Sequence, residues 1–366
     1  MKKKRDIGLE LLRIISMLMI ILLHSIDHSG LLENLVSGSK LYWYEWFIYA
    51  LVQVCVNCFV LISGYFLVKS KFRFEKLAML WIEVVFYAFI IKIIMMASGE
   101  IPFSLTSLIS CLVPILTGRY WFVTIYFGMY LLSPFLNIGI KAMSKRQHTS
   151  LVVILFLLFS VMVSIHPSFR GMNSGGGWSV AWFIVLYIIA AYIRLYYKPN
   201  GKILKPMILF FACPILMTCA LWIADKSSIG ILTSMADNWW KYDSVPAFVA
   251  SVALLIIFLN RPKELKSNRL KQIIIRMSSA TFGVYLIHAH ANICTESMWQ
   301  RIGMVSNMNK IWFPVYQIMV VIVIFLACCL IDILRQWLFQ KLNIKRVIDR
   351  IFEKVPYKYI YEDESR

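Results

Sequence analysis

Residues 7–27 read IGLELLRIISMLMIILLHSID, and this stretch decides the class of fold. It is apolar and matches the length of about 20 residues that an α-helix needs to cross the hydrocarbon core of a bilayer. The basic run at residues 2–5 precedes it, as in a secretory signal peptide, but no small-x-small cleavage site follows. We therefore expect residues 7–27 to remain in the mature chain as the first transmembrane helix.

The composition of the whole chain points to the same class. Its 366 residues are 60% hydrophobic and 16% charged, with a mean hydropathy of +0.71. A soluble domain is usually about 45–50% apolar and about 25% charged. The composition excludes a soluble globular enzyme, a disordered chain and a fibrous protein. It predicts an all-α, polytopic integral membrane helical bundle.

Ten apolar runs are candidates for transmembrane helices. The apolar segment 104–117 is too short, and its prolines Pro102 and Pro114 favour an interfacial or re-entrant piece. We expect a membrane domain at residues 1–340 and a short cytoplasmic tail at residues 341–366. The ten expected spans lie near residues 7–27, 43–68, 75–97, 120–140, 150–165, 178–197, 206–224, 244–260, 279–299 and 311–338.

The charge distribution orients these spans. The chain has 38 basic and 19 acidic residues, and most of the basic ones fall in every second loop or in the tail, where we count Arg335. By the positive-inside rule these segments are cytoplasmic, so we expect an even number of spans and both termini in the cytoplasm. The clustering in loops argues against nucleic acid as a partner and favours a lipid bilayer with anionic headgroups. The eight cysteines lie mostly in apolar runs, where we expect free, buried thiols.

Three ionisable residues fall inside the first expected span. Glu10 and Arg13 are three residues apart, so they share a helix face and can neutralise each other. His24 follows Arg13 by eleven residues, which is close to three helical turns and roughly 16 Å along the axis. Arg13 and His24 therefore project to one stripe, with Arg13 in the cytoplasmic half and His24 towards the outer end. Ionisable residues inside a span are costly, which makes each a functional candidate.

Five signatures resemble those of the acyltransferase-3 family of membrane O-acyltransferases, and they occur in the family's order. The resemblance covers the whole chain, although Lys76 stands where many members have a second arginine and Cys55–Cys58 where members often have a Val-Pro stretch. Without an SGNH-type domain, the chain resembles a stand-alone member. The signatures are Arg13 followed after ten residues by His24, Phe59-Val-Leu-Ile-Ser63-Gly64-Tyr65, Arg73-Phe-Glu-Lys76, Arg119-Tyr-Trp-Phe-Val, and Thr281-Phe-Gly-Val-Tyr285-Leu-Ile-His288.

The resemblance implies transfer of an acyl group from cytosolic acyl-CoA to a hydroxyl of an extracytoplasmic or surface glycan. His24 matches the catalytic histidine, as a general base near neutral pH or as a transient acyl carrier. His288 is a second candidate polar group of the site, and Glu296 is its candidate partner on nearly the same helix face.

Donor binding is expected on the cytoplasmic side. Acetyl-CoA is the expected donor substrate, and no cofactor is expected to be bound permanently. The candidate residues for acyl-CoA are Arg13, Arg73 and Lys76, for phosphate or thioester positioning, with Ser63, Gly64 and Tyr65 at a tunnel.

Aromatic clusters mark the outer loops. They fit an interfacial belt or a stacking platform for sugar rings, and the candidates for substrate binding are Arg119, Tyr120, Trp121 and Trp43. His24, His28, His288 and His290 could also form a metal site. We expect no metal, because the sequence places no span carboxylate or cysteine clearly to complete it.

Two other functions remain open at this stage. The main alternative is a transporter or flippase for a lipid-linked saccharide, without acyl-transfer chemistry. Its usual marks, an inverted repeat or a matched pair of broken spans, are not visible in the sequence. The third reading is a membrane sensor or scaffold in which His24 only titrates. Binding of acyl-CoA at the cytoplasmic face separates the enzyme from both, and a bacterial cytoplasmic membrane is the expected location.

Overall fold

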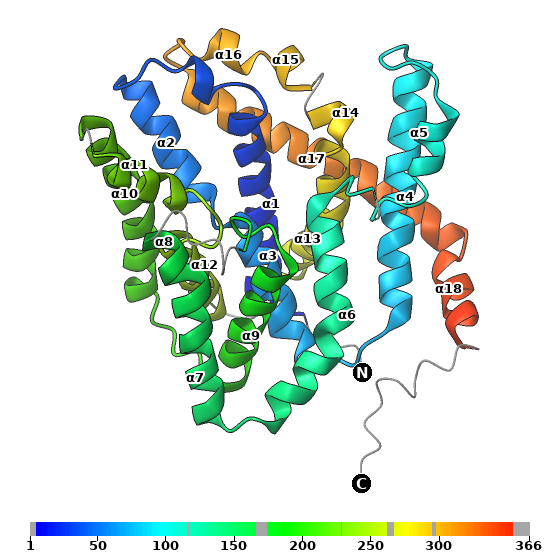
Figure 1. Cartoon of the computed structure of the whole chain (residues 1–366). Helices are drawn as coiled ribbons and strands as arrows, with labels where there is room; N and C mark the ends of the chain where they lie inside the picture. Colours follow the sequence, from blue (N-terminus) through cyan, green and yellow to red (C-terminus); the bar gives the residue numbers. More distant parts are fainter. Residues whose placement is uncertain are drawn as a thin grey trace.

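The computed structural model describes residues 5–115, 117–165, 174–227, 229–261, 267–294 and 298–353, except the side chains at 231 and 232. Within these ranges every regular element is a helix, and the helices form one bundle (Figure 1). The elements are α1 (Ile7–Asp27), η1 (Leu32–Asn34), α2 (Lys40–Val52), α3 (Cys55–Leu67), α4 (Phe74–Ala97), α5 (Leu105–Ser110), α6 (Trp121–Ala142), α7 (Lys145–Phe156), the π-helical turn η2 (Leu157–Val161), α8 (Met162–Ile165), α9 (Val180–Tyr196), α10 (Leu204–Lys226), α11 (Gly230–Trp239), α12 (Val245–Leu259), α13 (Asn268–His288), α14 (Ala291–Cys294), α15 (Met298–Ile302), α16 (Met304–Asn307), α17 (Phe313–Lys341) and α18 (Ile344–Glu353).

Helix α1 lies in the middle of the bundle. It packs against α2, α3, α12, α13 and α17, which surround it in Figure 1. The Asp6 side chain caps its start by accepting from the backbone N–H groups of Gly8, at 3.1 Å, and Leu9, at 3.4 Å. A Cβ atom on Gly8 would lie 2.5 Å from the carbonyl oxygen of Phe258, so the glycine permits close contact with α12. The central position of α1 lets several helices face its polar stripe.

Among the described residues, seven helical segments are long and apolar enough to cross a membrane. Two expected spans, 178–197 and 244–260, correspond to the shorter apolar helices α9 and α12. The expected span count of ten and the cytoplasmic placement of the termini remain predictions. The seven segments are Ile7–Asp27, Lys40–Leu67, Phe74–Ala97, Trp121–Ala142, Lys145–Ile165, Leu204–Lys226 and Phe313–Lys341.

The expected ninth span at 279–299 is misplaced. Helix α13 begins eleven residues earlier, at Asn268, because Ser267 caps it by accepting from the backbone N–H of Leu270 at 3.3 Å. It ends at His288, and short helices follow. Hydropathy located the apolar part of this helix but missed its polar, basic first turns. In the described part of residues 104–117, the one helix is the six-residue α5, which agrees with an element too short to span.

The connection between α2 and α3 falls inside the expected second span, 43–68. Gln53 and Val54 interrupt the helix there, yet the two pieces together count as one apolar segment of 28 residues. Further along α3, a Cβ atom on Gly64 would lie 2.9 Å from the Cα of Tyr187 in α9. The glycine therefore permits close packing of α3 on α9. The eight cysteines are free, and all but Cys219 are buried.

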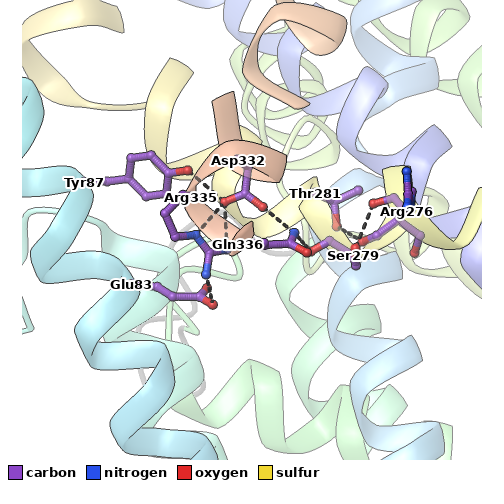
Figure 2. Close-up of polar contacts among 9 residues, drawn as sticks. Glu83, Tyr87, Arg276, Ser279, Thr281, Asp332, Arg335 and Gln336 are labelled. Atoms are coloured by element: carbon purple, nitrogen blue, oxygen red, sulfur yellow. Dashed lines mark hydrogen bonds and ion pairs between the residues drawn. The ribbon is translucent and has the colours of Figure 1, made fainter. Parts of the chain in front are cut away.

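A buried ionic network joins α4, α13 and α17 (Figure 2). The Arg335 guanidinium lies 2.7 Å from both the Asp332 and the Glu83 carboxylates, and Tyr87 donates to Asp332 at 2.8 Å. A Cβ atom on Gly283 would fall 2.0 Å from an Asp332 oxygen, so α13 and α17 approach closely here. Counting Arg335 as a tail charge was therefore wrong, because its side chain is only 6% exposed. Charges this deep are stable only when they are paired.

We predict that Arg335→Leu destabilises the bundle, because it leaves two carboxylates buried without their cation. Removing one partner of a buried ion pair costs about 3–5 kcal/mol. Unfolding in detergent should show a clear loss of stability. The exposed Arg346 on α18 supplies the matched control, Arg346→Leu, which should melt as the wild type does. Equal stability of the two variants would contradict the structural role of the network.

Helix α18 falls within the expected tail, but it packs against α4 and α17. The Arg73 guanidinium, in the connection before α4, lies 3.8 Å from the Asp349 carboxylate of α18. The loop between α3 and α4 and the helix α18 thus lie at the same end of the bundle. The remaining tail, residues 354–366, is outside the described part of the chain.

We predict that both termini face the cytoplasm. Green fluorescent protein fused to either end should then fluoresce, and alkaline phosphatase fused to either end should be inactive. A pattern that differs between the two ends would contradict an even number of spans.

Candidate functional site

A cavity of about 870 Å³ runs beside α1 for most of that helix. The residues of α1 that line the cavity are spaced three or four positions apart, which is the period of one helix face. Arg13 and His24 both line this cavity, so the predicted stripe is confirmed. Residues of α3, α6 and α13 form much of the remaining wall. The residues of the α1 wall that show the period are Glu10, Arg13, Met17, Ile20, His24 and Asp27.

His24 lies in a cluster of histidine rings. Its ring centroid is 5.0 Å from that of His28 and 5.1 Å from that of His288. The Nδ1 atom of His24 is buried and has no hydrogen-bond partner among the described residues. The structure therefore brings the rings of His24 and His288 together, although the two residues are far apart in the chain.

His288 is buried behind the cavity wall. Its Nδ1 atom is 2.6 Å from the carbonyl oxygen of Val284. A carbonyl can only accept, so Nδ1 carries the proton, and Nε2 of the neutral ring is a lone-pair acceptor. That nitrogen is buried without a described partner. His288 does not line the cavity, so it can orient or polarise His24 and is not placed to touch a substrate there.

Arg13 lies at the opposite end of the α1 stripe from His24, where it forms an ion pair with Glu10. Its guanidinium lies 3.2 Å from the Glu10 carboxylate and 5.6 Å from the ring centroid of Phe66. Ser278 of α13 donates to the same carboxylate. The predicted neutralisation by Glu10 is confirmed. The Arg13 side chain is still 30% exposed, so it can meet an anion that enters the cavity.

Of the three α3 residues expected to bind acyl-CoA, one lines the main cavity and two do not. Ser63 lines the cavity and donates to the carbonyl oxygen of Phe59 at 2.9 Å. Gly64 faces α9, and the Tyr65 hydroxyl accepts from Arg194 at 2.9 Å, so neither lines the cavity. Neither residue is placed to contact a molecule in this cavity, because the helix turns both of them towards α9.

The expected pair in the loop before α4 also lies outside the cavity lining. Arg73 is within 3.6 Å of Glu75 and 3.8 Å of Asp349, and its side chain is half exposed. Lys76 follows in the first turn of α4 and makes contacts of its own. Both side chains are exposed at the end of the bundle that carries α18.

The expected substrate-binding residues meet at the cavity, apart from Trp43. Arg119, Tyr120 and Trp121 line it. Tyr120 donates to the carbonyl oxygen of Leu286 at 2.8 Å, which joins the start of α6 to α13. Trp43 on α2 lines neither this cavity nor the smaller one described next, and it contacts the ring of Tyr42.

A second cavity of about 460 Å³ adjoins the first and shares Asp27, Trp178 and Tyr242 with it. The Trp178 ring stacks on Trp121 at 4.6 Å with an angle of 9° between the planes. Trp240 and Lys241 complete much of the lining. The sequence carries no signal that Trp178, which follows a glycine-rich stretch, stacks on the first turn of α6.

Two further candidate residues, His290 and Glu296, are not part of the histidine cluster described above. His290 lies beyond the end of α13, 6.1 Å from the ring of Tyr120. Burial, with the positive charges of Arg119 and Lys92, lowers the pKa of His290 to about 4, so it is neutral at pH 7. Glu296, the expected partner of His288, lies outside the described residues.

Cys294 is the residue of this region that sequence reasoning missed. It lies in α14 and lines the main cavity, and its sulfur and one ring nitrogen each from His24 and His28 all lie within 4.8 Å of one another. The sequence contained a signal: Cys294 follows His288 by six residues, at the same outer end of the expected spans as His24. The reason for expecting no metal, that no cysteine is placed near the histidines, therefore does not hold.

Comparison with known protein families identifies the family to which this chain belongs. The model of a family described as "Acyltransferase domain" matches residues 6–333, from the cap of α1 into α17. No curated protein and no solved structure matches the chain significantly. Because the family match covers nearly the whole chain, including every lining residue of both cavities except Arg5, the chain belongs to the acyltransferase-3 family, whose members transfer acyl groups.

Proposed function

We propose that this membrane acyltransferase moves an acyl group, acetyl in the first instance, from cytosolic acyl-CoA to a hydroxyl of an extracytoplasmic or surface glycan. The proposal rests on the observation that Arg13 and His24 lie on one face of α1 and line the same cavity, the larger of the two described above. A donor with anionic phosphates can meet Arg13, and its thioester can reach towards His24. The family membership favours this reading over a transporter without chemistry.

The chemistry centres on His24. A neutral imidazole accepts the proton of the acceptor hydroxyl as its oxygen attacks the thioester carbonyl. The new C–O bond forms, the C–S bond breaks, and the proton passes from the imidazolium to the departing CoA thiolate. His24 can instead carry the acyl group on a ring nitrogen between two such transfers. Both routes use the same position, and His288 at 5.1 Å would hold the ring in place.

The donor is proposed to enter from the cytoplasmic end. Arg5 and Arg13 both line the cavity there, although each is partly neutralised by Glu10. Arg73 and Lys76, outside the cavity, would contact the phosphates of the CoA head group at the surface. Guanidinium groups suit phosphate because they offer paired donors in a fixed plane.

The acceptor is proposed to occupy the smaller cavity. Aromatic rings and a carboxylate are the groups that stack on a sugar ring and accept from its hydroxyls, and Trp178, Trp240 and Asp27 provide both. Because both cavities are lined by Asp27, one turn from His24, we propose that a bound sugar presents a hydroxyl to the imidazole. The location that fits these partners is a bacterial cytoplasmic membrane.

We predict that His24→Ala lowers acyl transfer by about 10²–10⁴-fold, the usual worth of a positioned acid–base group. The assay follows thiol release and label transfer from radiolabelled acetyl-CoA to a host glycan extract, with the protein in nanodiscs. The control is His148→Gln, which alters a buried histidine bonded to Ile188 on the far side of α9. Undiminished transfer by His24→Ala would remove His24 from the mechanism.

We predict that Trp240→Ala raises KM for the glycan roughly fivefold or more and leaves KM for acetyl-CoA near the wild-type value, because it removes a ring from the acceptor cavity alone. Trp222→Ala, which removes an exposed tryptophan on the outer face of α10, is the matched control. An equal rise in both KM values would contradict separate donor and acceptor cavities.

A further inference from the structure

His24, His28 and Cys294 form a compact set of metal-binding side chains. Their ligand atoms lie within 4.8 Å of one another, and among the described residues no other group of histidine, cysteine and carboxylate side chains is this close. The two histidines are four residues apart at the end of α1, and the thiol comes from α14 across the cavity. The set is therefore held by two elements that are distant in sequence.

The distances allow a common ion. Three atoms no more than 4.8 Å apart can share a centre at about 2.8 Å or less from each. Bonds from zinc to nitrogen and sulfur are about 2.0–2.3 Å, so each ligand atom needs to move by less than about 1 Å. Rotation of side chains is enough for such a shift.

The donor types select the class of ion. Two imidazoles and one thiolate suit zinc and similar borderline ions, whereas calcium and magnesium require oxygen ligands. Three protein ligands leave a fourth position, which here opens into the cavity. The thiolate and the nearby Asp27 carboxylate, which lines the same cavity, would offset the charge of the ion. The buried Nδ1 of His24 has no other described partner that would have to be displaced.

We propose that His24, His28 and Cys294 bind a divalent transition metal ion of the zinc class, and that the bound ion inhibits acyl transfer by occupying His24. The inhibition rests on the proposed function of His24, whereas the binding does not. A ligated imidazole has lost the lone pair that would accept a proton or an acyl group. The ion would also fill the end of the cavity where the acceptor hydroxyl and the thioester meet.

Binding is tested on the full-length protein in detergent, purified without a histidine tag. Cobalt(II) is the optical probe, since a thiolate ligand gives a charge-transfer band, and zinc should displace it with 1:1 stoichiometry. Changing a residue that only supports a ligand costs 10–100-fold in metal affinity, so losing a direct ligand should cost at least about tenfold. Cys294→Ala should lose the thiolate band, and His28→Ala should keep the band but bind more weakly.

The matched control is Cys213→Ala, which removes a buried thiol on α10 and should bind cobalt as the wild type does. Absence of a thiolate band in the wild type, or an unchanged band in Cys294→Ala, overturns the site.

Inhibition is tested separately by adding zinc to the acyl-transfer assay and restoring activity with a chelator. Zinc should inhibit the wild type and Cys213→Ala at concentrations that match its binding, and it should inhibit Cys294→Ala only at concentrations at least about tenfold higher. Each variant is compared with its own zinc-free rate. Stoichiometric binding without inhibition overturns the regulatory half of the proposal. If wild-type protein free of metal transfers no acyl group, the proposed function fails, and the cobalt titration still decides the site.

Discussion

The cost of placing charge inside a bilayer determines the arrangement of this protein. Helix α1 carries Glu10, Arg13 and His24 on one face, and such a helix cannot expose that face to lipid. The fold places α1 at the centre and surrounds it with α2, α3, α12, α13 and α17. Arg13 and Glu10 neutralise each other, and Ser278 of α13 donates a hydrogen bond to the Glu10 carboxylate. The polar stripe thereby becomes the wall of an internal cavity.

The same cost explains the second group of buried charges. Arg335, Asp332 and Glu83 hold α17, α13 and α4 together next to the cavity wall, where Gln336 also donates to the carbonyl oxygen of Ser279 at 3.3 Å (Figure 2). Ser279 lines the cavity, so the network supports the helix that carries His288. The polar groups of α1 line the cavity, whereas those of α17 hold neighbouring helices in place beside it.

Local patterns predicted most of the fold, and only part of the site. Hydropathy identified the long apolar helices, and the helical period placed Arg13 and His24 on one stripe, because both properties depend on neighbours in the chain. Hydropathy misplaced α13, because the basic first turns of that helix carry no apolar signal. Local patterns could not show that Gly64 and Tyr65 face α9 or that Arg335 is buried, and they indicated only that Cys294 and His24 share the outer end of the expected spans. Those facts depend on packing between distant helices, which spacing in the sequence does not encode.

We propose that an acyl group passes through the cavity along α1, from a donor on one side of the membrane to an acceptor on the other. Proteoliposomes with radiolabelled acetyl-CoA outside and the glycan acceptor trapped inside test this transfer. Label should then appear on the trapped glycan, and vesicles without the protein should show none. Labelling that occurs only when donor and acceptor are on the same side would contradict it.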